Sequence, residues 1–210
     1  MDDPIKTIQR QTQRYWYVDG LTEIGAGTLI FLLGLLYLLV AMLSPGALAD
    51  WLIGFGQPGL LVAGWLIVNW VVRGLKERIT YPRTGYVAYR RERGGKRTRA
   101  ILVTVGLAAG FAIAAVYFGK LAGERMIPVL IGLMMAGAVA YLGYTFSLRR
   151  FYLLAAVSVV LGGAGTLFRL GDNFSMALFF GGFGIAWVVS GAVTLSAYLH
   201  STQPALGEDV

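Results

Sequence analysis

Six long apolar runs constrain what this chain can fold into. They cover residues 20–43, 58–78, 99–119, 125–147, 150–168 and 173–199. A helix needs about 20 apolar residues to cross the hydrocarbon core of a bilayer, and every run is near that length or longer. Charged residues make up 14% of the chain, whereas soluble domains carry roughly 25%. The sequence therefore predicts an all-α integral membrane protein, a bundle of about six transmembrane helices.

The start of the second span is open to two interpretations. Residues 20–78 hold the first two spans, and the stretch 47–57 between them is bounded by Pro-Gly pairs and is too short to span a bilayer. It fits a short outer interfacial helix anchored by Trp51, with Pro58 in the first turn of the second span. Alternatively, residues 49–75 form one uninterrupted span. The sequence favours neither interpretation.

Lys and Arg residues are concentrated in alternate connections between the spans. Three lie in the N-terminal segment 1–19, ten lie from Arg73 to Arg99, and two follow the fourth span, against three on the other side. Loops rich in Lys and Arg face the cytoplasm. We therefore expect both termini, the basic loop 79–98 and the tail 200–210 to be cytoplasmic. Spans three to six would then fill residues 99–199, in a multi-pass protein of the plasma (inner) membrane.

The N-terminal segment 1–19 has a helical spacing of basic residues. Lys6, Arg10 and Arg14 are four residues apart, so a helix would place them on one face. One interpretation is an interfacial amphipathic helix that touches anionic lipid headgroups. A solvated basic arm is the other, and the sequence does not separate them.

The basic loop has two halves of different character. Residues 90–99 are mostly Arg and Lys, which suits contact with anionic membrane lipids at the cytoplasmic face. No RNA- or DNA-binding fold accompanies this patch, so nucleic acid is not an expected partner. Residues 80–89 predict a turn around Pro82 with tyrosines beside it, which fits either an interfacial turn or a docking loop. The candidate headgroup- or partner-binding residues are Tyr81, Arg83, Tyr86, Arg90 and Arg91.

Ionisable and polar residues near the ends of the first two spans form a candidate polar mouth. Asp19 and Glu23 are four residues apart at the start of span one, so they share a helix face. Asn69, Arg73 and Glu77 form a similar stripe at the end of span two. Both stripes lie near the expected cytoplasmic side, and charges at that depth seek partners. We therefore predict a Glu23–Arg73 pair, with a purely structural role and a functional vestibule both open.

Small residues recur at helical spacing along the later spans. Glycine contributes 29 of 210 residues, about twice its average share of roughly 7%. Small faces let membrane helices approach closely, so we expect glycine-rich helix interfaces, and a homo-oligomer is possible. The faces concerned are Gly132, Ala136 and Ala140 in span four, and Ala177, Gly181, Gly184, Val188 and Gly191 in span six.

No catalytic or cofactor-binding set is present in the sequence. There is no Cys, and the single His200 lies at the edge of the last apolar run, which excludes thiolate chemistry and Cys- or His-rich metal sites. In the middles of the spans, the residues that interrupt the apolar side chains are only Thr, Ser and Gly, so no charged stripe crosses the membrane. We therefore expect a non-enzymatic small channel or transporter subunit for a weakly charged or apolar solute. A membrane adaptor that docks a partner through loop 80–99 is the alternative, and a lipid-modifying enzyme using Asp19 and Glu23 is the least favoured.

Overall fold

Long helices account for the regular structure of the residues that the computed structural model describes, 19–79, 117 and 126–201. No strand occurs in these ranges. The helices are α2 (Leu21–Met42), α3 (Ala47–Trp51), the π-helical segment η1 (Leu52–Gly56), α4 (Gln57–Ile79), α7 (Ile127–Phe146), α8 (Arg149–Leu167) and α9 (Asp172–Ser201). With α3, η1 and α4 taken together, five helices are long and apolar enough to cross a membrane. The expected third span, 99–119, lies outside the described residues, as do residues 1–18, most of the basic loop 79–98 and residues 202–210.

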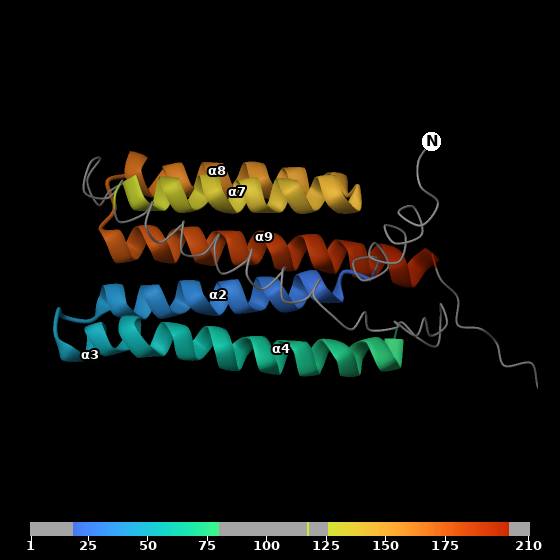
Figure 1. The fold of residues 1–210 in the computed structure, drawn as a ribbon, viewed down its shortest axis with the longest axis horizontal. Helices are drawn as coiled ribbons and strands as arrows, with labels where there is room; N and C mark the ends of the chain where they lie inside the picture. The colour runs from blue at the N-terminus through green and yellow to red at the C-terminus, as the bar shows by residue number, and fades with distance from the viewer. Residues whose placement is uncertain (1–18, 80–116, 118–125, 202–210) are drawn as a thin grey trace, which may run out of the picture.

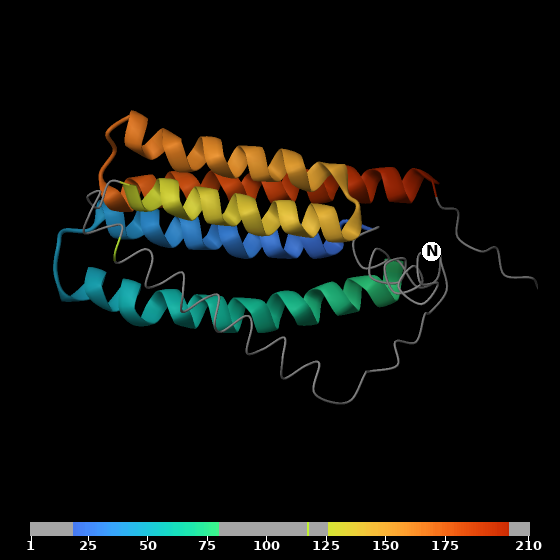
Figure 2. The same cartoon turned by 45° about the horizontal axis from the view of Figure 1, so that its top comes forward.

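The helices lie side by side and nearly parallel (Figure 1). α8 and α7 form one side of the bundle, α9 follows, then α2, and α4 forms the opposite edge; the rotated view in Figure 2 agrees. α9 is the most extensive partner of α2, although the two helices come from opposite ends of the described chain. α4 packs mainly on α2.

One end of the bundle, named here the basic end, holds the start of α2 and the ends of α4 and α9 (Figure 1). Of the six Lys and Arg residues in the described ranges, five lie at this end and Arg169 lies at the other. The five are Arg73, Lys76, Arg78, Arg149 and Arg150. This segregation is what the positive-inside pattern requires of a threaded bundle. Which side of a membrane the basic end faces stays a prediction.

The two described ends that flank residues 80–116 and 118–125 lie at opposite ends of the bundle. Ile79 closes α4 at the basic end, whereas Met126 precedes α7 at the other end (Figure 1). The chain between them therefore connects both ends of the bundle. The expected span 99–119 stays a prediction.

Helical geometry is continuous from Ala47 to Ile79. The stretch 47–57 is therefore not set off from the following span by a break at Pro58. Proline has no N–H to donate to the carbonyl four residues earlier, and the π-helical turn Leu52–Gly56 lies directly before it. Such a turn absorbs a local misfit in hydrogen bonding without ending the helix. The position of residues 47–57 relative to a membrane surface stays a prediction.

An aromatic ladder on α9 forms the centre of the hydrophobic core. Phe179, Phe183 and Trp187 are four residues apart, so they lie on one face of the helix, against α7 and α8. Phe151 of α8 packs against this ladder, with 5.7 Å between its ring centroid and that of Trp187. Phe151, Phe179 and Phe183 have no exposed surface. The core therefore lies mainly where α9 meets α7 and α8, and Ala26 and Ile30 of α2 also pack against it.

The face of α9 beside the aromatic ladder packs against α2 through small residues. A methyl group added at Gly184 would lie 2.4 Å from the backbone nitrogen of Phe31, and one at Gly27 would lie 2.8 Å from Cβ of Trp187. Both glycines are buried. The predicted small-residue face of α9 is therefore confirmed as a helix interface, in which the backbones approach too closely for a Cβ.

α7 and α8 also pack closely through glycines. A methyl group at Gly132 would lie 2.9 Å from Cα of Gly162, and the hydroxyl of Ser158 donates a 2.9 Å hydrogen bond to the carbonyl of Gly132. Ala136 is buried on the same face of α7. The expected glycine-rich packing of the fourth span is therefore confirmed.

Candidate functional site: paired charges and an apolar groove

Glu23 lies in the first turn of α2 and is fully buried. Its Oε1 is 2.5 Å from Nη2 of Arg150 in the first turn of α8, and its Oε2 accepts a 3.0 Å hydrogen bond from the hydroxyl of Ser190 in α9. The guanidinium of Arg150 also lies over the ring of Phe151, 5.8 Å from the centroid. Glu23 thus joins α2 to two other helices at the basic end.

Asp19 forms a second buried ion pair at the same end. Its Oδ2 is 3.3 Å from Nζ of Lys76 in the last turns of α4, and both side chains are almost fully buried. The other carboxylate oxygen, Oδ1, accepts a 3.2 Å hydrogen bond from the backbone N–H of Leu21. Asp19 therefore fixes the start of α2 and ties it to α4.

The predicted pair between Glu23 and Arg73 is wrong. Arg73 is exposed, and Arg150 of α8 takes its place. α4 faces α2 through the stripe that includes Val72 and Lys76, since a methyl group at Gly25 of α2 would lie 2.9 Å from Cγ2 of Val72. Each residue along a helix is turned by about 100° from the one before it. Arg73 therefore points away from α2, and the cation that reaches the interface is Lys76.

The expected polar mouth is only partly assembled. Asp19 and Glu23 lie together at the basic end as predicted, whereas Arg73 and Glu77 are exposed and Asn69 is half-buried on α4. A functional role for these five residues stays a prediction. The loop candidates Tyr81, Arg83, Tyr86, Arg90 and Arg91 lie outside the described residues.

Sequence reasoning missed three residues of the charged cluster: Lys76, Arg150 and Ser190. Lys76 and Arg150 lie near helix ends, so in the sequence they were counted only among the charges that set the topology. They were not considered as partners of Asp19 and Glu23. Their signal is positional. Lys76 is four residues after Val72, on the face of α4 that packs against Gly25, where small residues mark a close helix approach.

This charged cluster, Asp19, Glu23, Lys76, Arg150 and Ser190, is named here the clamp, because it holds four helices together. Two carboxylates and two cations balance one another, and they connect α2 to α4, α8 and α9. Removing one member of such a buried pair leaves an uncompensated charge and typically costs about 3–5 kcal/mol. The described residues contain no group of three His, Cys, Asp or Glu that could hold a metal ion.

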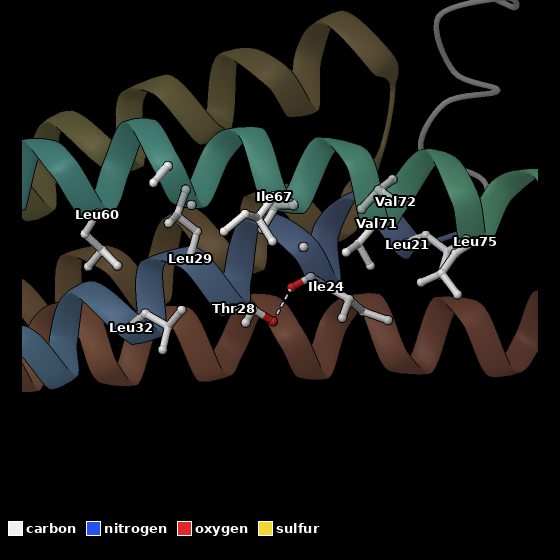
Figure 3. Close-up of a pocket in the computed structure, with 14 residues that line it drawn as sticks. Leu21, Ile24, Thr28, Leu29, Leu32, Leu60, Ile67, Val71, Val72 and Leu75 are labelled. Atoms are coloured by element: carbon white, nitrogen blue, oxygen red, sulfur yellow. Dashed lines mark hydrogen bonds between the residues drawn. The ribbon is translucent and has the colours of Figure 1, made fainter.

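A groove between α2 and α4, whose lining residues are drawn in Figure 3, begins at Leu21, two residues after Asp19 of the clamp. Its volume is about 380 Å³, within the range of roughly 300–1,000 Å³ that ligand pockets occupy. Its walls run from Leu21 and Leu75 at the basic end to Leu32 and Leu60. The 15 steps along α4 from Leu60 to Leu75 correspond to about 22 Å at 1.5 Å per residue. The groove is therefore a long channel along the helices rather than a round cavity.

The walls of the groove offer almost no polar atoms. Thr28 is the one lining residue with a polar side chain, and its hydroxyl donates a 2.8 Å hydrogen bond to the carbonyl of Ile24 (Figure 3). A threonine satisfied in this way presents its methyl group. The groove therefore suits a ligand that is apolar along its length.

Comparison with known proteins assigns no relative to this chain: it matches no family model, no curated protein and no solved structure.

Proposed function

We propose that the protein is a multi-pass membrane protein of the plasma (inner) membrane, with its basic end and both termini on the cytoplasmic side. We further propose that it binds an apolar solute of the bilayer in the α2–α4 groove, as a small transporter or channel subunit. The groove is the observation that carries this proposal, because it combines length, volume and apolar walls.

The position of the groove supports entry from the side. α4 forms the edge of the described bundle and packs mainly on α2 (Figures 1 and 2). A hydrophobic molecule dissolved in the bilayer would reach such a groove without passing through water. Binding there needs no desolvation of polar wall groups, since the one wall hydroxyl is satisfied within its own helix.

The distribution of charge argues against a path for ions through the described helices. Their Asp, Glu, Lys and Arg residues all lie toward the two ends of the bundle, and the acids at the basic end with buried side chains are ion-paired. Ion pathways in membranes are marked by ionisable residues that face the interior at depth. The weakly charged or apolar solute expected from the sequence is the better fit.

The adaptor alternative depends on loop 80–99, which lies outside the described residues, and no described residue favours it. A homo-oligomer likewise stays a prediction.

A pair of neighbouring substitutions tests the proposed function. Ala63 lines the groove, whereas Val62 is 64% exposed on the outer surface of α4. The full-length protein in lipid nanodiscs would be photolabelled with a diazirine-bearing fatty acid and the labelled peptides mapped by mass spectrometry. We expect label on α2 and α4, a several-fold loss in Ala63→Phe because its ring fills the groove, and no loss in Val62→Phe. Equal labelling of the two variants would overturn the proposal.

A further inference from the structure

We infer that the ligand of the α2–α4 groove is an anionic phospholipid, held with one acyl chain along the groove and its phosphate on Arg78. The inference rests on the proposed function, since it adds a charged headgroup to the apolar chain that the groove takes.

Arg78 continues the wall of the groove beyond its apolar part. Val71 and Leu75 line the groove on α4 (Figure 3), and Arg78 follows them by seven and three residues. Those spacings place all three side chains on one face of a helix. Arg78 is exposed and lies about 4.5 Å further along the axis than Leu75, at 1.5 Å per residue. A ligand lying in the groove therefore meets a guanidinium at the basic end.

The other cations that approach the start of α2 are already paired. Lys76 binds Asp19 and Arg150 binds Glu23. Within the described ranges, the Arg78 side chain takes part in no ion pair or hydrogen bond. The adjacent Glu77 is turned by about 100° around the helix from Arg78. Among the residues that the structure describes, Arg78 is thus the cation on the groove face that no other side chain pairs.

A phosphodiester matches this geometry. Guanidinium groups bind phosphate oxygens with two parallel hydrogen bonds, and anionic phospholipids are concentrated in the cytoplasmic leaflet that the basic end is expected to face. The volume of about 380 Å³ holds on the order of a dozen methylene-sized groups, at roughly the 30 Å³ that a water molecule occupies. That is the scale of one acyl chain. Chain binding then depends on the groove, and headgroup selection depends on Arg78.

Lipid competition on the full-length protein tests the inference. Phosphatidylglycerol and phosphatidylcholine with identical oleoyl chains would be titrated into detergent-solubilised protein, and the bound lipids counted by native mass spectrometry. We expect the wild type to retain phosphatidylglycerol several-fold better than phosphatidylcholine. Arg78→Gln should reduce this preference to within twofold, mainly by weakening phosphatidylglycerol binding, because the choline cation of phosphatidylcholine already balances the same phosphodiester. Arg73→Gln is the matched control and should keep the preference, because Arg73 is also exposed but lies off the groove face.

Each result separates the headgroup from the chain. A preference that survives Arg78→Gln, or that Arg73→Gln removes as fully, would overturn the inference and indicate a general effect of surface charge. If the wild type binds both lipids equally and Ala63→Phe abolishes this binding, the inference of an anionic headgroup on Arg78 is refuted. The proposed function, binding of an apolar chain in the groove, would remain supported. If the wild type binds neither lipid, both proposals fail and the groove is covered by protein. An unchanged thermal midpoint for Arg78→Gln would confirm that the variant is folded.

Discussion

Gly184→Ala is expected to destabilise the protein, although alanine is the better helix former. Gly184 lies in the middle of α9, buried against α2. The added Cβ would lie 2.4 Å from the backbone nitrogen of Phe31 and 2.8 Å from the carbonyl oxygen of Gly27. All of these are backbone atoms, so no side chain can rotate out of the way. The two helices have to move apart by on the order of 1 Å to reach ordinary contact distances of about 3.5 Å.

That separation sets the size of the effect. A gap of about 0.5–1 Å removes a quarter to a half of the attraction between facing atoms, each pair contributing about 0.1–0.2 kcal/mol. If about 40 pairs, the number that one buried leucine makes, lose a third of their attraction, the loss is about 2 kcal/mol. The gain in helix propensity from Gly to Ala returns up to about 1 kcal/mol. We therefore expect a net loss of about 1 kcal/mol, and a larger loss for Gly184→Leu.

Gly137→Ala is the matched control, because a Cβ at Gly137 of α7 would meet nothing within 4 Å. It carries the same change in helix propensity without the clash, so its stability should stay equal to that of the wild type or rise. The measurement is the thermal unfolding midpoint of each purified variant in one detergent. If Gly184→Ala and Gly137→Ala shift the midpoint equally, the close contact of α2 and α9 does not exist as described.

Two further expectations concern the charged cluster and the threading of the chain. Glu23→Gln and Arg150→Gln should each lower the free energy of unfolding by about 3–5 kcal/mol, and the double variant by less than their sum; strictly additive effects in this cycle would contradict the buried pair. Because the chain has no native cysteine, single cysteines at positions 171 and 201 report topology without background. An impermeant thiol reagent added to intact cells should label a cysteine at Gly171 and not one at Ser201. The opposite pattern would show that the basic end faces outward and would refute the predicted orientation.

The helices themselves were predictable from the sequence, because uninterrupted apolar runs carry a strong signal. The expected spans 20–43 and 173–199 correspond to Leu21–Met42 and Asp172–Ser201 within two residues at each end. The continuous helix from Ala47 was harder to predict, since Pro58 normally marks a helix start. Only the wider π-helical turn before it lets the helix continue, and no residue type specifies such a turn.

The partners of the buried charges were not predictable from helix spacing alone. The spacing of Asp19 and Glu23 predicted one shared helix face, whereas Asp19 lies before the start of α2 and Gly20 between them is left-handed. Spacing also could not tell which neighbour each face meets, because that depends on the rotation of every helix about its axis. Neighbours in sequence are usually neighbours in space, and this rule correctly places α4 beside α2. It does not reveal that Glu23 faces Arg150 and Ser190.

One signal in the sequence does point to the packing of α2 against α9. Gly20, Gly27 and Gly34 are seven residues apart, as are Gly184 and Gly191 on α9. Two glycine rows with the same period fit one another along a shared seam. The structure brings these rows together, with a methyl group at Gly20 placed 2.3 Å from the carbonyl oxygen of Gly191.

The packing of the first described helix on the last has a consequence for biosynthesis. Glu23 and Ser190 are 167 residues apart, and ribosomes add about 5–20 residues per second. At that speed, α2 emerges on the order of ten to thirty seconds before the part of α9 that covers its glycine face. During this interval Glu23 has neither Ser190 nor, for most of it, Arg150. The newly made helix therefore carries an unpaired carboxylate and an uncovered glycine face until α8 and α9 are made.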